Sequence, residues 1–136
     1  MIRSILVGTD TSAAATMAVE EACVLARTHD AELVVLYVRP PVDARQVFDP
    51  AAVPDVDRHF ELLGRRLSGV RFRTRRESGD AAATICDVAE EEGVDVIVVG
   101  NRGTHGRRRW LLGSVPNAVL QHSPCSVFVV DTRELQ

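Results

Sequence analysis

Runs of apolar residues that alternate with amphipathic stretches constrain the fold of this chain more than any other feature. Runs typical of strands buried on both faces of a sheet lie at residues 5–7, 33–38 and 94–99. Stretches with helical spacing or helix-end signals lie at residues 13–28, 56–67, 80–93 and 114–122. This alternation predicts an α/β fold with a mostly parallel sheet, and 136 residues suit one domain over residues 1–136.

The remaining strands predict the order of the sheet. Residues 70–76 alternate between apolar or small side chains and arginines, which is typical of an edge strand, and residues 126–131 predict the fifth strand. These features favour an open, Rossmann-like sheet of order 3-2-1-4-5 with helices on both faces. We interpret the arginines of the edge strand, and the glutamates at 90–92, as solvated charges.

Composition and charge exclude several classes of function. The net charge of −3 argues against broad binding to nucleic acid, and all 16 basic residues are arginine, so the chain has no phosphate-binding or Schiff-base lysine. No apolar stretch approaches the roughly 20 residues of a membrane span. The N-terminal apolar run reaches Asp10 without the features of a signal peptide, so we expect a cytoplasmic protein with no membrane contact.

A glycine-rich segment follows the fourth strand, where the order of the strands reverses. Gly100 and Gly103 precede nine residues, and Gly113-Ser114 then begins a helix, with Ser114 as its expected cap. Ligands of open α/β sheets bind at such a reversal, and the N–H groups at a helix start favour an anion. The alternative is a glycine-rich turn followed by an ordinary capped helix; the position favours phosphate binding.

The spacing G-x-x-G, nine residues, G-S resembles the nucleotide-binding signature of the universal stress protein family. Further markers include the stretch 5–10, Gly79-Asp80 and the stretch 123–127, so the resemblance extends over the whole chain. It implies an ATP-binding member in which Asp10 approaches the ribose and adenine and the backbone of Val38 meets the adenine. The implied nucleotide-binding residues are Thr9, Asp10, Thr11, Val38, Gly100, Arg102, Gly103, Gly113, Ser114 and Val115.

Two residues depart from the family pattern. Thr11 stands where the family often has glycine, and Pro116 stands where many ATP-binding members carry a hydroxyl residue. The loss of that hydroxyl removes a contact to a terminal phosphate or a metal, so AMP or cyclic AMP is an alternative ligand to ATP, with or without Mg²⁺. The three remaining histidines outside the glycine-rich segment, His29, His59 and His122, are interpreted as surface residues.

The resemblance also implies a partner and a role. Family members often form homodimers, and the apolar strand from Val127 to Val130 is an edge that pairing would cover. We expect a stress or metabolic sensor that binds ATP, has no catalytic residues and hydrolyses ATP slowly at most. The alternatives are an adenylating enzyme, which the sequence after strand 1 disfavours, and a nucleotide-free interaction protein.

Overall fold

Strands and helices alternate strictly in the computed structural model, which describes residues 1–39, 41, 55–101 and 113–132. The elements are β1 (Ser4–Thr9), α1 (Ala13–His29), β2 (Glu32–Arg39), α2 (Val56–Arg66), β3 (Phe72–Ser78), α3 (Ala81–Glu92), β4 (Val96–Gly100), α4 (Ser114–His122) and β5 (Ser126–Val130). Within these ranges, no helix has the length and apolar character needed to cross a bilayer.

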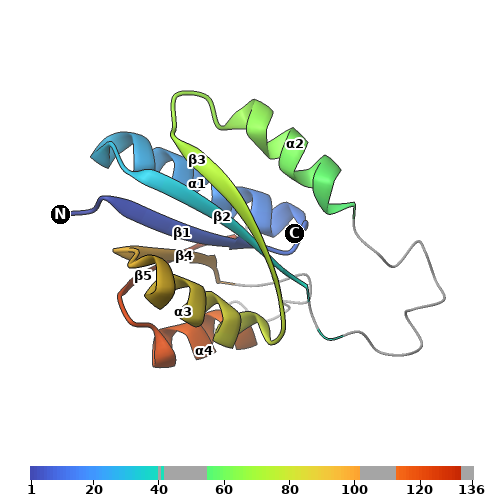
Figure 1. Cartoon of the computed structure of the whole chain (residues 1–136), viewed down its shortest axis with the longest axis vertical. Coiled ribbons are helices and arrows are strands. Elements are labelled where there is room, and N and C mark those ends of the chain that lie inside the picture. The colour runs from blue at the N-terminus through green and yellow to red at the C-terminus, as the bar shows by residue number, and fades with distance from the viewer. Residues whose placement is uncertain (40, 42–54, 102–112, 133–136) are drawn as a thin grey trace.

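The five strands form one sheet of order β3-β2-β1-β4-β5, in which every neighbouring pair is parallel. Helices α1 and α2 cover one face of the sheet, and α3 and α4 cover the other (Figure 1). The predicted order, reversal point and two covered faces are confirmed. Because all strands run the same way, their carboxyl ends lie along a single edge of the sheet.

The core consists of two apolar layers, one on each face of the sheet. Successive strand residues point to opposite faces, so Ile5 and Val7 pack against α1, whereas Leu6 packs against the α3 and α4 side. All three side chains have no exposed surface. This two-sided burial explains why the inner strands are apolar without alternation.

Side-chain caps define where the helices begin. The hydroxyl of Ser12 accepts a hydrogen bond of 3.0 Å from the Ala15 N–H at the start of α1, and Asp80 does the same for Ala83 at the start of α3. Helix α3 ends at Gly93, whose left-handed φ of 64° suits glycine. These caps fix where each helix begins or ends relative to the sheet.

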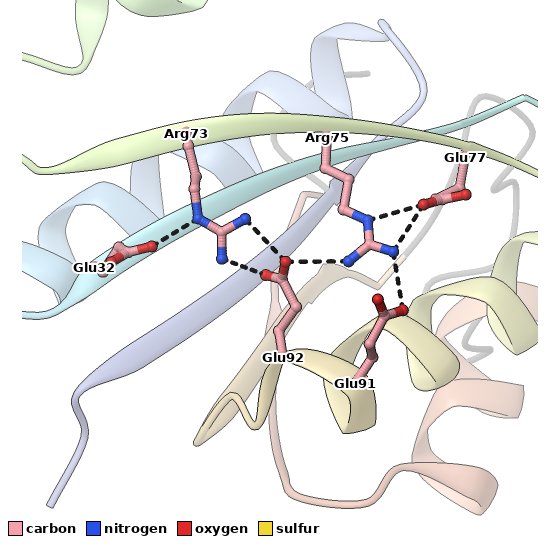
Figure 2. Close-up of polar contacts among 6 residues, drawn as sticks. All are labelled: Glu32, Arg73, Arg75, Glu77, Glu91 and Glu92. Carbon is pink, nitrogen blue, oxygen red and sulfur yellow. Dashed lines mark hydrogen bonds and ion pairs between the residues drawn. The ribbon is translucent and has the colours of Figure 1, made fainter.

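The arginines of β3 are not simply solvated, and that prediction was wrong. Figure 2 shows Arg73 and Arg75 directed at the end of α3, where Glu92 accepts hydrogen bonds from both guanidinium groups. Arg73 also bonds Glu32 of β2 at 2.8 Å, and Arg75 bonds Glu91 at 3.0 Å. Alternate residues of β3 point to the face of α3, so these charges reach one another although they are far apart in sequence.

Candidate functional site

Strands β1 and β4 separate at the point where the strand order reverses. Their last paired residues are Val7 and Val98, although β1 continues to Thr9 and β4 to Gly100. Two strand ends are therefore left unpaired with each other at the carboxyl edge. This is the location at which open α/β sheets bind ligands.

The backbone of Asn101 links the end of β4 to the start of α4. Its carbonyl oxygen accepts a hydrogen bond of 2.8 Å from the Gly113 N–H, and its own N–H donates to the Val130 carbonyl at 2.8 Å. Its side-chain oxygen accepts hydrogen bonds from the N–H and hydroxyl of Thr132, at 3.1 and 2.9 Å. The first turn of α4 is thereby fixed beside the separated strand ends.

Helix α4 presents hydrogen-bond donors at this edge, but its cap differs from the prediction. Gly113 is the N-cap and Ser114 is the first helical residue, so Ser114 does not cap the helix; the extended backbone of Gly113 already turns the chain into it. Pro116 has no N–H, and the Asn117 N–H bonds the Gly113 carbonyl. The N–H groups of Ser114 and Val115 have no partner among the described residues, and Ser114 is exposed.

The described part of the fold does not require glycine at position 113. Its φ of −62° is open to any residue, and a Cβ there would lie 3.5 Å from Pro116 and 3.6 Å from the Asn101 oxygen, which are ordinary contacts among the described residues. At Gly8, by contrast, a Cβ would lie 3.1 Å from the Ile85 side chain, so packing of α3 on β1 explains that glycine. A missing side chain at 113 leaves room for a ligand to approach the backbone.

The turn between β1 and α1 is held by two side chains. The Asp10 carboxylate accepts a hydrogen bond of 2.9 Å from the Ser12 N–H, and the Thr9 hydroxyl accepts one of 3.3 Å from the Thr11 N–H. Thr11 has a left-handed φ of 71°, which is uncommon for a β-branched residue and is a conformation that glycine adopts freely. Asp10 is exposed, so its carboxylate is open to a ligand.

His59 belongs to this site, and its interpretation as a surface residue was wrong. Its Nε2 lies 2.8 Å from the hydroxyl oxygen of Thr9, a residue only 6% exposed. Burial lowers the pKa of His59, and the nearby Asp10 carboxylate opposes this shift. One signal was present in the sequence: His59 follows Val56 by three residues and therefore shares the apolar face of α2 with Leu63.

Some of the other predicted site residues lie in the described part of the structure, and some lie outside it. Val38 is buried near the end of β2, one position beyond Tyr37, the partner of Thr9 across the sheet. The structure therefore brings Thr9, Val38, Gly100 and Gly113 to one edge, whereas Arg102 and Gly103 lie outside the described residues. Within the described ranges, no three His, Cys, Asp or Glu residues cluster as a metal site requires.

Comparisons with known proteins identify one family to which this chain is similar. The model of the universal stress protein family matches residues 1–131. A relative from Staphylococcus haemolyticus assigned to the same family is 33% identical over 147 aligned positions, which cover 98% of this chain and 87% of the relative.

Solved structures resemble the chain over nearly its full length. A universal stress protein in complex with cAMP is 26% identical, with a TM-score of 0.79, and the match covers 96% of this chain and 98% of that protein. A family member from Arabidopsis thaliana with AMP bound shares the fold at 20% identity and a TM-score of 0.68, covering 95% of this chain and 91% of that one. The family match and the 33% identity together establish that this chain belongs to the universal stress protein family.

Proposed function

We propose that this protein binds an adenine nucleotide, with ATP as the first candidate, at the carboxyl edge between β1 and β4. The observation that carries the proposal is the start of α4. There, a glycine that the described fold does not require stands beside two N–H groups with no partner among the described residues and beside an exposed serine. This arrangement suits phosphate oxygens, because a helix N-terminus combines free donors with a favourable dipole.

The rest of the edge suits the nucleoside. Val38 supplies a backbone position on the adenine side, and the Asp10 carboxylate, which has one oxygen bonded to Ser12, can accept a ribose hydroxyl with the other. The bound relatives support this class of ligand, since one was solved with cAMP. Arg102 and Gly103 complete the residues that the family resemblance assigns to phosphate binding.

Cyclic AMP or AMP is the second candidate, and Pro116 favours it. Proline at this position of α4 removes both an N–H group and the hydroxyl that many ATP-binding members carry, so fewer donors remain for a third phosphate. Thr11 adds a side chain where the family often has glycine, which reduces the room at the turn.

We expect binding rather than catalysis, with ATP hydrolysis slow at most. The protein would then report metabolic state or stress through a homodimer. The strand β5 favours this assembly, because it lies at the sheet edge and its Phe128 side chain is 43% exposed.

Substitutions at Gly113 test the phosphate site without weakening α4. Aspartate and asparagine are both favoured N-cap residues and are nearly equal in size, so Gly113→Asp and Gly113→Asn differ mainly in charge. Calorimetric titration of nucleotide-stripped protein with ATP and Mg²⁺, ADP, AMP and cAMP gives the affinity of each ligand. We expect Gly113→Asp to weaken ATP binding at least about tenfold more than Gly113→Asn does, because the carboxylate repels phosphate.

The results of this titration separate the candidates. A preference for cAMP or AMP over ATP would select the second candidate. Equal affinities of the aspartate and asparagine variants would place the phosphates elsewhere. If the wild-type protein bound none of the four nucleotides, a nucleotide-free interaction protein would be the better account.

A further inference from the structure

We propose that His59 is a positioning residue of the nucleotide site, which holds the ligand-binding turn through Thr9 and makes nucleotide affinity depend on pH. The inference rests on the proposed function. It assigns a role to α2, a helix to which the family resemblance assigns no site residue.

The geometry provides a short hydrogen-bonded chain from α2 to the turn. The Thr11 N–H donates to the Thr9 hydroxyl oxygen at 3.3 Å, and that oxygen lies 2.8 Å from Nε2 of His59. The Thr9 hydroxyl has one hydrogen. If Nε2 carries no proton, this hydrogen points to Nε2. The Thr11 N–H, the Thr9 hydroxyl and Nε2 of His59 then each have a hydrogen-bond partner.

Protonation of His59 disrupts this arrangement. A protonated Nε2 donates to the Thr9 oxygen, which then accepts two hydrogen bonds and must direct its own hydrogen elsewhere in a region where Thr9 is 6% exposed. A buried hydroxyl hydrogen without an acceptor is costly. The neutral imidazole with its proton on Nδ1 is therefore the form that holds the turn at Thr11.

The charged groups around His59 leave this preference in place. Asp10, on the turn after β1, favours the protonated form, but burial outweighs it and lowers the pKa of His59. From β3, Arg76 lies over the ring of the adjacent Phe60 and pairs with Asp57 of α2. On α2 itself, Asp55 caps the helix by accepting a hydrogen bond from the Arg58 N–H.

The expected sign follows from these contacts. Affinity is highest where His59 is neutral and decreases as pH falls through its pKa, which lies below the ordinary value of about 6.5. We expect the wild-type affinity for the preferred nucleotide to decrease about three- to tenfold more than that of His59→Gln between pH 7.5 and pH 5.

Three variants and one control variant separate positioning from a purely structural role. His59→Gln offers an amide oxygen to the Thr9 hydroxyl but does not titrate, so it should bind more tightly at pH 7.5 than His59→Phe does and lose the His59-dependent part of the pH profile. His59→Phe and Thr9→Val each remove the bond, so both should bind more weakly at pH 7.5. His29→Gln, on an exposed histidine at the end of α1, should keep the wild-type profile.

The nucleotide itself titrates in this pH range, and its titration affects the affinity of every variant equally. This contribution therefore cancels when the pH profiles of the variants are compared. Urea unfolding checks that each variant is folded at both pH values. Identical pH profiles for wild type and His59→Gln would overturn the inference while leaving the proposed function intact, as would wild-type affinity in His59→Phe. Absence of nucleotide binding by the wild type at pH 7.5 would overturn the proposed function and this inference with it.

Discussion

The two edge strands of the sheet are protected in different ways. On the face covered by α3 and α4, Arg73 and Arg75 of β3 cover this edge by pairing with Glu92 at the end of α3 (Figure 2). On the opposite face, Phe128 of β5 points to the side of α1 and α2 yet is 43% exposed, whereas its neighbours Val127 and Val129 pack against the other layer.

This difference follows from where the helices lie. Leu63 of α2 and Leu67, which follows this helix, belong to the apolar layer against which Phe72 of β3 packs. Helix α2 therefore covers the β3 side of this face, and Phe128 of β5 stays exposed on the same face. Val119 of α4 is buried in the layer on the opposite face, and Val127 and Val129 of β5 are partly buried against that layer. An edge strand that carries charged side chains resists pairing with another sheet, whereas an apolar edge strand favours such pairing. The sheet therefore has one edge suited to solvent and one suited to a second copy.

The largest expected effect is on association. We predict that Phe128→Glu converts a homodimer to a monomer, because it places a charge in the apolar edge that pairing would bury. Sedimentation equilibrium measures the change. Thr74→Glu is the matched control, because Thr74 is an exposed residue on the opposite edge strand and should leave the mass unchanged. A wild-type monomer at about 100 µM, or dissociation by Thr74→Glu as well, would remove the distinction between the edges.

The next effect is on stability at the charged edge. Glu92→Gln should lower the free energy of unfolding by about 1–2 kcal/mol, because Glu92 has a side chain only 12% exposed and bonds two guanidinium groups. The loss stays this small because Arg73 is half exposed and water partly screens its charge. The urea midpoint measures it, and Glu90→Gln, which removes no ion pair among the described residues, should leave the midpoint unchanged.

The same glutamate should make the charged edge sensitive to acid. The Arg73 guanidinium, through its hydrogen bonds, holds the pKa of Glu92 below its ordinary value. A lowered pKa in the folded state contributes stability above the unfolded value of about 4.5, and this contribution is lost as pH falls through the folded value. The difference in unfolding free energy between wild type and Glu92→Gln should therefore shrink below about pH 4.5. A constant difference down to pH 2.5 would contradict the assignment.

The smallest effect is expected at Glu91. Its side chain is 67% exposed and bonds Arg75, which keeps its bonds to Glu77 and Glu92 when Glu91 is changed. Glu91→Gln should cost no more than about 0.5 kcal/mol in the same urea titration. A loss equal to that of Glu92→Gln would mean that the edge depends on total charge rather than on the less exposed carboxylate.

The fold was largely predictable because its signals are local. Apolar runs identify inner strands, alternation with arginine identifies β3 as an edge, and Ser12 and Asp80 mark helix starts within a few residues. Each signal depends on neighbours in sequence. The order of the strands then follows from which of them need two covered faces.

The site was predictable only where it follows strand ends. Gly100 and Gly113 could be placed at the carboxyl edge because they adjoin a strand end and a helix start. The contact between His59 and Thr9 was missed because these residues are 50 positions apart in the chain. The pairing of Arg73 with Glu92 was missed for the same reason: a row of charges does not reveal which opposite charges the fold brings within reach. Ser114 was assigned as a cap because serine favours that position, yet Gly113 occupies it.

The parallel arrangement of the strands offers a place to attach a reporter. The turns that precede the strands lie at the amino ends of the strands, and the proposed site lies at their carboxyl ends. The length of β1 alone separates these two ends by roughly 20 Å. Asp30, in the turn between α1 and β2, has a side chain 98% exposed and a left-handed φ of 52° that asparagine or glycine also adopts readily. A dye or surface tether at this position would leave the ligand edge facing solution, so the protein could be oriented on a sensor chip.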